Sequence, residues 1–134
     1  MAQILIIEDE PAIALILSEV LRDHGHESAI APTGVAGLER LAQDPVPDLV
    51  LLDLFMPGLG GRAVLERMRA EPRSRHTPVV VVTGAVPSVA DFPPVGSYQA
   101  LLGKPFNLSD VIAVIDRCLA GRAKTAKGRA GGEG

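Results

Sequence analysis

Residues 4–21 read ILIIEDEPAIALILSEVL, an unbroken apolar run followed by a helical pattern. The run at residues 4–7 has the length of a strand and no alternation of apolar and polar residues. Such runs are typical of strands that are covered on both faces in a parallel sheet. Pro11 suits the first turn of a helix, and Gly25 suits the position just after its end. The stretch therefore predicts a buried strand followed by a helix.

The same unit recurs along the chain. Apolar runs at residues 49–52, 79–82 and, more weakly, 100–102 predict further buried strands, and residues 26–31 suit an edge strand. Helical patterns lie between the runs. Thr33 can cap one of them, another ends before Pro72, and a last one over residues 108–119 has Asn107 or Ser109 as its cap. Alternating strands and helices predict an α/β fold with a doubly wound parallel sheet and right-handed crossovers.

One segment departs from this pattern. Residues 84–96 contain three prolines and two glycines. Proline and glycine disfavour a regular helix. The helix after the fourth strand is therefore predicted to be short, displaced or absent, with at most one turn around residues 88–91.

The composition excludes several classes of protein. The chain has 134 residues, enough for one domain with its own core. Its single cysteine, Cys118, excludes an intrachain disulfide framework and a cysteine-based zinc site. The apolar runs are too short to span a membrane, and the N-terminus does not have the pattern of a signal peptide. These features predict a cytoplasmic protein without membrane attachment.

The charge is unevenly distributed along the chain. The net charge is −3, yet residues 121–134 carry four basic residues against one acidic residue. The remaining acidic body argues against direct DNA binding, which needs a basic face. The glycine-rich end has no large apolar side chain. We therefore expect a domain over residues 1–120 and a disordered Gly/Lys/Arg-rich tail over residues 121–134. A linker to an output domain and a basic docking arm are the alternatives for this tail.

Polar residues follow each of the central apolar runs. The carboxyl ends of parallel strands meet at one edge of the sheet, where ligands bind. An acidic residue in this position can simply favour the start of a helix, but groups from four segments together indicate a site. These groups are Glu8, Asp9 and Glu10 after the first run, Asp53 after the third strand, Thr83 after the fourth, and Lys104 with Pro105 after the fifth.

The acidic members of this set predict a cation site. Two carboxylates about 4 Å apart repel each other by about 4 kcal/mol at an effective dielectric constant of about 20. A hard divalent cation such as Mg²⁺ relieves this repulsion. A carboxylate nucleophile, a lysine, a hydroxyl and a metal together are suited to phosphoryl transfer to an aspartate.

Four motifs resemble the receiver domain of two-component response regulators over residues 3–120. They read IEDEP at residues 7–11, LDLFMPGLGG at residues 52–61, VTG at residues 82–84 and KPF at residues 104–106. Their spacing, with 30 residues from Asp53 to Thr83 and 21 from Thr83 to Lys104, is also similar to that family. The resemblance implies a flavodoxin-like strand order 2-1-3-4-5 and a cis peptide bond before Pro105.

The resemblance also implies a reaction. Asp53 would accept a phosphoryl group from the phosphohistidine of a sensor histidine kinase. Lys104 would pair with the phosphoryl oxygens, and Thr83 would donate a hydrogen bond to one of them. The protein would then be a signalling phosphoacceptor with self-catalysed phosphorylation and dephosphorylation, and not an enzyme acting on a separate substrate.

Mg²⁺ is the cofactor that the resemblance implies. Asp9 would bind the ion directly and Glu8 through water. Asp53 and the backbone carbonyl of Phe55 would complete the protein ligands.

Three departures from the family affect output. Leu101 occupies the position of an aromatic switch residue, Gly84 follows Thr83 where alanine or serine is usual, and the helix after the fourth strand is interrupted. They predict an atypical output switch and signalling by protein contact, for example with a histidine phosphotransfer protein. The alternative is a pseudo-receiver, an interaction module that neither binds metal nor accepts phosphate.

Overall fold

Five parallel strands form the central sheet of the computed structural model, which describes residues 2–84, 93–94 and 96–128. The strand order is β2-β1-β3-β4-β5, as the resemblance implied. Their register places Asp53 beside Val82 and Thr83 beside Gly103, so that the polar residues at the strand ends lie along one edge. The strands are β1 (Gln3–Ile7), β2 (Glu27–Ala31), β3 (Leu49–Asp53), β4 (Val79–Thr83) and β5 (Ala100–Gly103).

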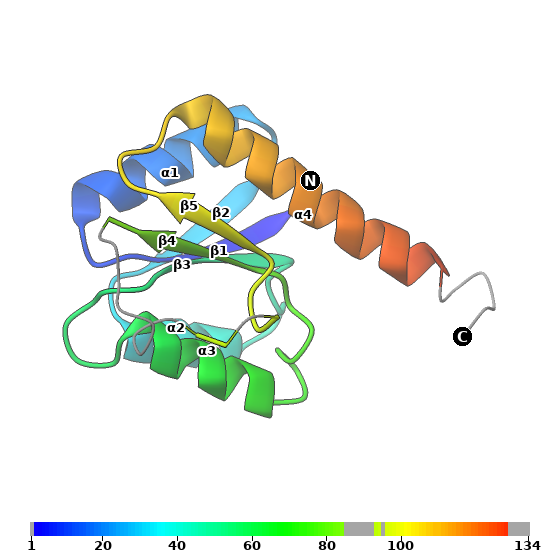
Figure 1. Ribbon diagram of the computed structural model, residues 1–134, viewed down its shortest axis with the longest axis horizontal. Coiled ribbons are helices and arrows are strands. Elements are labelled where there is room, and N and C mark those ends of the chain that lie inside the picture. Colours follow the sequence, from blue (N-terminus) through cyan, green and yellow to red (C-terminus); the bar gives the residue numbers. More distant parts are fainter. Residues whose placement is uncertain (1, 85–92, 95, 129–134) are drawn as a thin grey trace.

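Two pairs of helices cover the two faces of the sheet. The helices α1 (Pro11–Asp23) and α4 (Leu108–Gly128) lie on one face, and α2 (Gly34–Leu41) and α3 (Gly61–Ala70) lie on the other (Figure 1). Each face has its own apolar core. β1, β3 and β4 contribute side chains to both cores, which explains why their sequences are continuously apolar.

The predicted helix ends are confirmed at several positions. Thr33 Oγ1 accepts a hydrogen bond from the Ala36 amide at 3.0 Å, and Asn107 Oδ1 accepts one from the Asp110 amide at 2.9 Å. Asn107 is therefore the cap of α4, and Ser109 donates its hydroxyl to the same oxygen. Gly25, just after α1, has a φ of +87°, a conformation that favours glycine.

The connection from β4 to β5 is described only in part. Its described residues, 84, 93–94 and 96–99, contain no helix. The turn predicted around residues 88–91 lies outside the described residues.

The last helix extends further than predicted. α4 continues to Gly128, so the structure differs from the predicted disordered tail at residues 121–128. The prediction considered only the lack of apolar side chains that could be buried. Alanine, lysine and arginine have high helix propensity, and a helix already anchored in the core extends without a new nucleation step. Residues 129–134 lie outside the described residues. Within the described part of the chain, no helix is both long enough and apolar enough to cross a bilayer.

Candidate functional site

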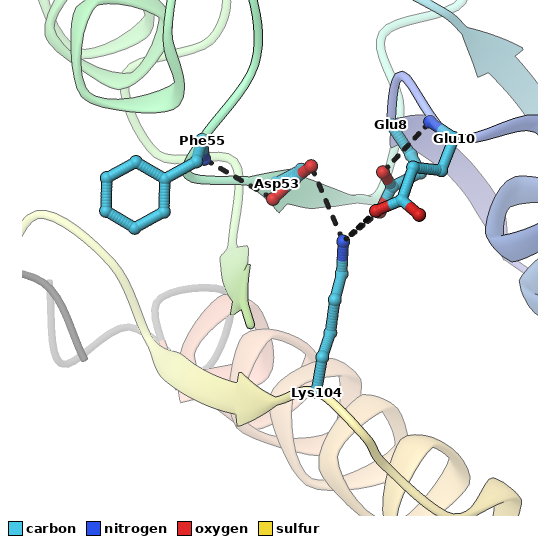
Figure 2. Close-up of polar contacts among 5 residues, drawn as sticks. All are labelled: Glu8, Glu10, Asp53, Phe55 and Lys104. Carbon is cyan, nitrogen blue, oxygen red and sulfur yellow. Dashed lines mark hydrogen bonds and ion pairs between the residues drawn. The ribbon is translucent and has the colours of Figure 1, made fainter. Parts of the chain in front are cut away.

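The polar side chains at the carboxyl ends of the strands converge on one site. Glu8 follows β1, Asp53 ends β3 and Lys104 follows β5 (Figure 2). Thr83 ends β4. Glu8, Asp53 and Thr83 are 2%, 3% and 6% exposed, unusual values for polar residues. Buried polar groups cost folding free energy unless they are paired, so their assembly at one point indicates a functional role.

Lys104 is the centre of the site. Its Nζ lies 3.0 Å from Glu8 Oε1, 3.3 Å from Glu10 Oε1 and 3.5 Å from Asp53 Oδ2. Its backbone amide donates to the Thr83 carbonyl at 2.8 Å, which fixes the start of the side chain beside β4. Burial by itself lowers the pKa of Lys104, but the close approach of Glu8 and the charges of Asp53 and Glu8 raise it overall. The ammonium is therefore a permanent positive charge among carboxylates.

Asp53 has an unusually high proton affinity. Burial is the largest cause, and the neighbouring Glu8 carboxylate adds to it, so that the pKa of Asp53 is raised to about 7. The charge of Lys104 opposes this shift without cancelling it. The Phe55 amide donates to Asp53 Oδ1 at 3.4 Å, while the Phe55 ring points away from the site (Figure 2). A further positive charge at the site would favour the ionised form of Asp53.

The acidic residues after β1 fit a small hard cation. Carboxylate oxygens of Glu8, Asp9 and Glu10 lie within 4.8 Å of one another. Glu8 Oε2 accepts a hydrogen bond from the Glu10 amide at 3.2 Å. Glu8 Oε1 is buried and, despite the 3.0 Å approach of Lys104 Nζ, accepts no hydrogen bond of good geometry from a described residue. An acceptor with unused capacity beside a second buried carboxylate suits Mg²⁺, which prefers oxygen ligands.

Three further residues were singled out from the sequence, namely Pro105, Asp9 and Leu101. The Lys104–Pro105 peptide bond is cis, as the resemblance implied. Asp9 is partly buried and belongs to the acidic cluster with Glu8 and Glu10. Leu101, at the position where the resemblance implied an aromatic switch residue, lies on β5 and is 47% exposed.

Two contacts of Lys104 were not predicted from the sequence. Glu10 is an ion-pair partner of Lys104. From the sequence it was only the third of three adjacent acidic residues, with no partner predicted for it. Gly84 lies against the aliphatic part of the same lysine, because a Cβ at position 84 would be 3.4 Å from Lys104 Cβ and Cδ. The only sequence signal for this second contact was the glycine that follows Thr83.

Comparisons with known proteins show which family the chain is similar to. The family model for the response regulator receiver domain matches residues 4–116. The response regulator PleD of Caulobacter vibrioides is 37% identical over 82 residues, which are 61% of this chain and 18% of PleD. Protein PilH of Pseudomonas aeruginosa is 37% identical over 83 residues, which are 62% of this chain and 68% of PilH.

A solved structure shows the same fold. The CheY-like response regulator receiver domain protein from Methanospirillum hungatei matches with a TM-score of 0.85 and 27% sequence identity. The match covers 93% of this chain and 98% of that one. The match thus spans nearly all of that receiver protein, whereas the match to PleD spans less than a fifth of PleD.

Proposed function

The chain belongs to the response regulator receiver domain family of two-component signalling, and from this premise we propose that Asp53 accepts a phosphoryl group from a sensor histidine kinase. The observation that carries the proposal is the contact of 3.5 Å between Lys104 Nζ and Asp53 Oδ2 at the edge of the sheet. It pairs a buried carboxylate with an ammonium group. After phosphoryl transfer, the same ammonium can contact the phosphoryl oxygens.

The transfer uses the ionised form of Asp53. One carboxylate oxygen attacks the phosphorus of a phosphohistidine and forms an acyl phosphate, while the phosphorus–nitrogen bond breaks. The imidazole leaves with the electron pair of that bond and takes up a proton. Lys104 pairs with the phosphoryl oxygens, and the buried hydroxyl of Thr83 donates a hydrogen bond to one of them. Fixed positive charge and donors stabilise the charge that collects on these oxygens.

Mg²⁺ is the proposed cofactor. Receiver domains generally bind this ion at an acidic pocket, and Glu8, Asp9, Asp53 and the Phe55 carbonyl are the proposed ligands here. The buried, underused Glu8 Oε1 supports this assignment. When bound, the ion supplies positive charge that favours ionised Asp53 and offsets the charge of an incoming phosphoryl group.

The proposed domain covers residues 1–120 and signals by contact with another protein. Its output is proposed to be atypical, because Leu101 is exposed on β5 where an aromatic switch would lie. A histidine phosphotransfer protein is one candidate partner, and direct DNA contact is not part of the proposal. Self-catalysed loss of the phosphoryl group would return the domain to its resting state.

The test is intact mass spectrometry after incubation with acetyl phosphate and Mg²⁺. The wild-type chain should gain the mass of one phosphoryl group, and Asp53→Asn should gain none. If the wild type gains no mass, binds no Mg²⁺ and binds no beryllofluoride, the proposal is wrong and the chain is a pseudo-receiver. Binding of beryllofluoride without a stable mass gain would support the proposed site with rapid hydrolysis.

A further inference from the structure

Lys104 has three carboxylate partners, and the proposed function gives a role to only two of them. Glu8 is a proposed metal ligand and Asp53 the proposed phosphoacceptor. Glu10 has no such role, yet Lys104 Nζ donates to its Oε1 at 3.3 Å. Lys104 Nζ is closer to the two glutamates, at 3.0 and 3.3 Å, than to Asp53, at 3.5 Å. The ammonium thus rests on the glutamate side of the site (Figure 2).

We propose that Glu10 is a positioning residue that holds Lys104 on this side in the unphosphorylated protein and competes with the phosphoryl group for its ammonium. The inference rests on the proposed function and deepens it. It gives the third acid of the cluster a role in setting how readily Lys104 is released to the phosphoryl group.

The backbone conformation and an amide hydrogen bond fix the position from which the Glu10 side chain extends. Glu10 is the N-cap residue of α1 and has extended backbone angles, with φ −90° and ψ 110°. Its amide donates to Glu8 Oε2 at 3.2 Å, which anchors it to the buried glutamate. From this position the side chain reaches Lys104, which is 94 residues away in the sequence.

The backbone at Lys104 fixes the other end of this side chain. Its amide donates to the Thr83 carbonyl at 2.8 Å, which holds it beside the end of β4. Gly84 lies next to the stem, where an added Cβ would meet Lys104 Cβ and Cδ at 3.4 Å, an ordinary van der Waals distance. Because glycine presents no side chain to the stem, the choice of partner depends on the ammonium end.

The exposure of the pair makes this restraint reversible. The Glu10 side chain is 60% exposed, whereas Glu8 is buried. An exposed ion pair contributes little free energy, so Lys104 can leave Glu10 when a phosphoryl group offers stronger charge and more acceptors. Glu10 is then expected to weaken phosphoryl binding modestly.

The experiment measures the affinity of beryllofluoride, a phosphoryl analogue, at saturating Mg²⁺ by calorimetry or NMR titration. Glu10→Gln removes the charge, and Glu10→Asp keeps the charge but shortens the reach by one methylene group. Both variants should bind beryllofluoride more tightly than the wild type, by about two- to fivefold. Glu19→Gln, which removes an exposed charge elsewhere on α1, should bind like the wild type.

Two results would overturn the inference. If Glu10→Asp binds beryllofluoride like the wild type and only Glu10→Gln binds it more tightly, the negative charge of Glu10 is the cause, and its contact with Lys104 is not. If neither variant differs from the wild type, Glu10 does not compete for Lys104. A double-mutant cycle adds a direct check, because Glu10→Gln should have no effect in a Lys104→Gln background.

A second readout separates this inference from the proposed function. In metal-free protein, the ¹⁵N chemical shift of the Lys104 ammonium should change in Glu10→Gln and stay unchanged in Glu19→Gln. If the wild type fails to bind beryllofluoride, the proposed function is wrong, and the inferred competition between Glu10 and the phosphoryl group is wrong as well. If the wild type binds but the lysine signal is unchanged in Glu10→Gln, only the role of Glu10 is wrong.

Discussion

Ionised Asp53 destabilises the folded protein when no metal or phosphoryl group is bound. Its pKa is raised to about 7 chiefly by burial and then by Glu8, so the folded state binds a proton more tightly than the unfolded state does. A raised carboxyl pKa makes folding progressively less favourable as the pH rises from about 4, where the unfolded aspartate ionises, to about 7, where the folded one does. Above that pH the folded protein contains an ionised, buried carboxylate next to Glu8, offset only in part by Lys104.

Asp53→Asn should therefore stabilise the metal-free protein at pH 8. We expect an increase of about 1–3 kcal/mol in the free energy of unfolding, because each unit of pKa shift corresponds to about 1.4 kcal/mol and coupling to Glu8 reduces the sum. At pH 5 the gain should be clearly smaller, since Asp53 is protonated in the folded protein while the unfolded aspartate is already ionised, and it should vanish only below about pH 4. Urea unfolding in EDTA at both pH values measures this. The exposed Asp23→Asn serves as control, and an equal gain at both pH values would contradict the prediction.

At the scale of elements, Arg69 joins three segments. It lies in the last turn of α3, and its guanidinium donates to five oxygens that are all neutral. Two of them, the Ser97 carbonyl at 2.8 Å and Gln99 Oε1 at 3.3 Å, belong to the segment before β5. Gln99 Oε1 also accepts from the Val79 amide at the start of β4. The arginine thus ties the described end of the β4–β5 connection to α3.

Replacing Arg69 should be costly even though charge pairing is not involved. We expect Arg69→Met to lower the free energy of unfolding by about 2–4 kcal/mol, because several carbonyl groups lose their donor. Arg69→Lys should recover little of this, since an ammonium cannot reproduce the forked geometry. Arg67→Met, on the exposed side of the same helix, should change stability by less than about 0.5 kcal/mol. Urea unfolding ranks the variants, and equal losses at both arginines would refute the assigned role.

At the scale of the whole molecule, the two cores share one sheet and the site lies at its carboxyl edge. The described α4 residues that pack against the sheet end at Leu119, while the helix itself continues to Gly128 (Figure 1). The added turns of α4 therefore extend beyond the packed part of the fold.

A chain that stops after Ala120 should fold with nearly the stability of the full chain. The expected loss is below about 1 kcal/mol, because no described core residue lies beyond this point. Ile115→Ala in the full chain gives the contrast, with an expected loss of about 2–4 kcal/mol for a fully buried side chain. Thermal or urea unfolding compares them. If truncation costs as much as Ile115→Ala, the proposed domain boundary at residue 120 is wrong.

The sequence alone determined the strands, most helix ends and the edge of the sheet where the polar residues gather. Apolar runs such as residues 79–82 can only be accommodated between two covering layers, and the ends of parallel strands necessarily share an edge. For this reason Glu8, Asp53 and Lys104 could be expected at one site before any distance was known.

Only the tertiary structure decided how these groups are paired. The contact between Glu10 and Lys104, the position of the Lys104 stem beside Gly84 and the bonds of Arg69 to Ser97 and Gln99 join residues far apart in sequence. Such contacts depend on side-chain reach and burial, which sequence periodicity does not encode. The raised pKa of Asp53 has the same origin, because desolvation and the proximity of Glu8 exist only once β1 and β3 lie side by side.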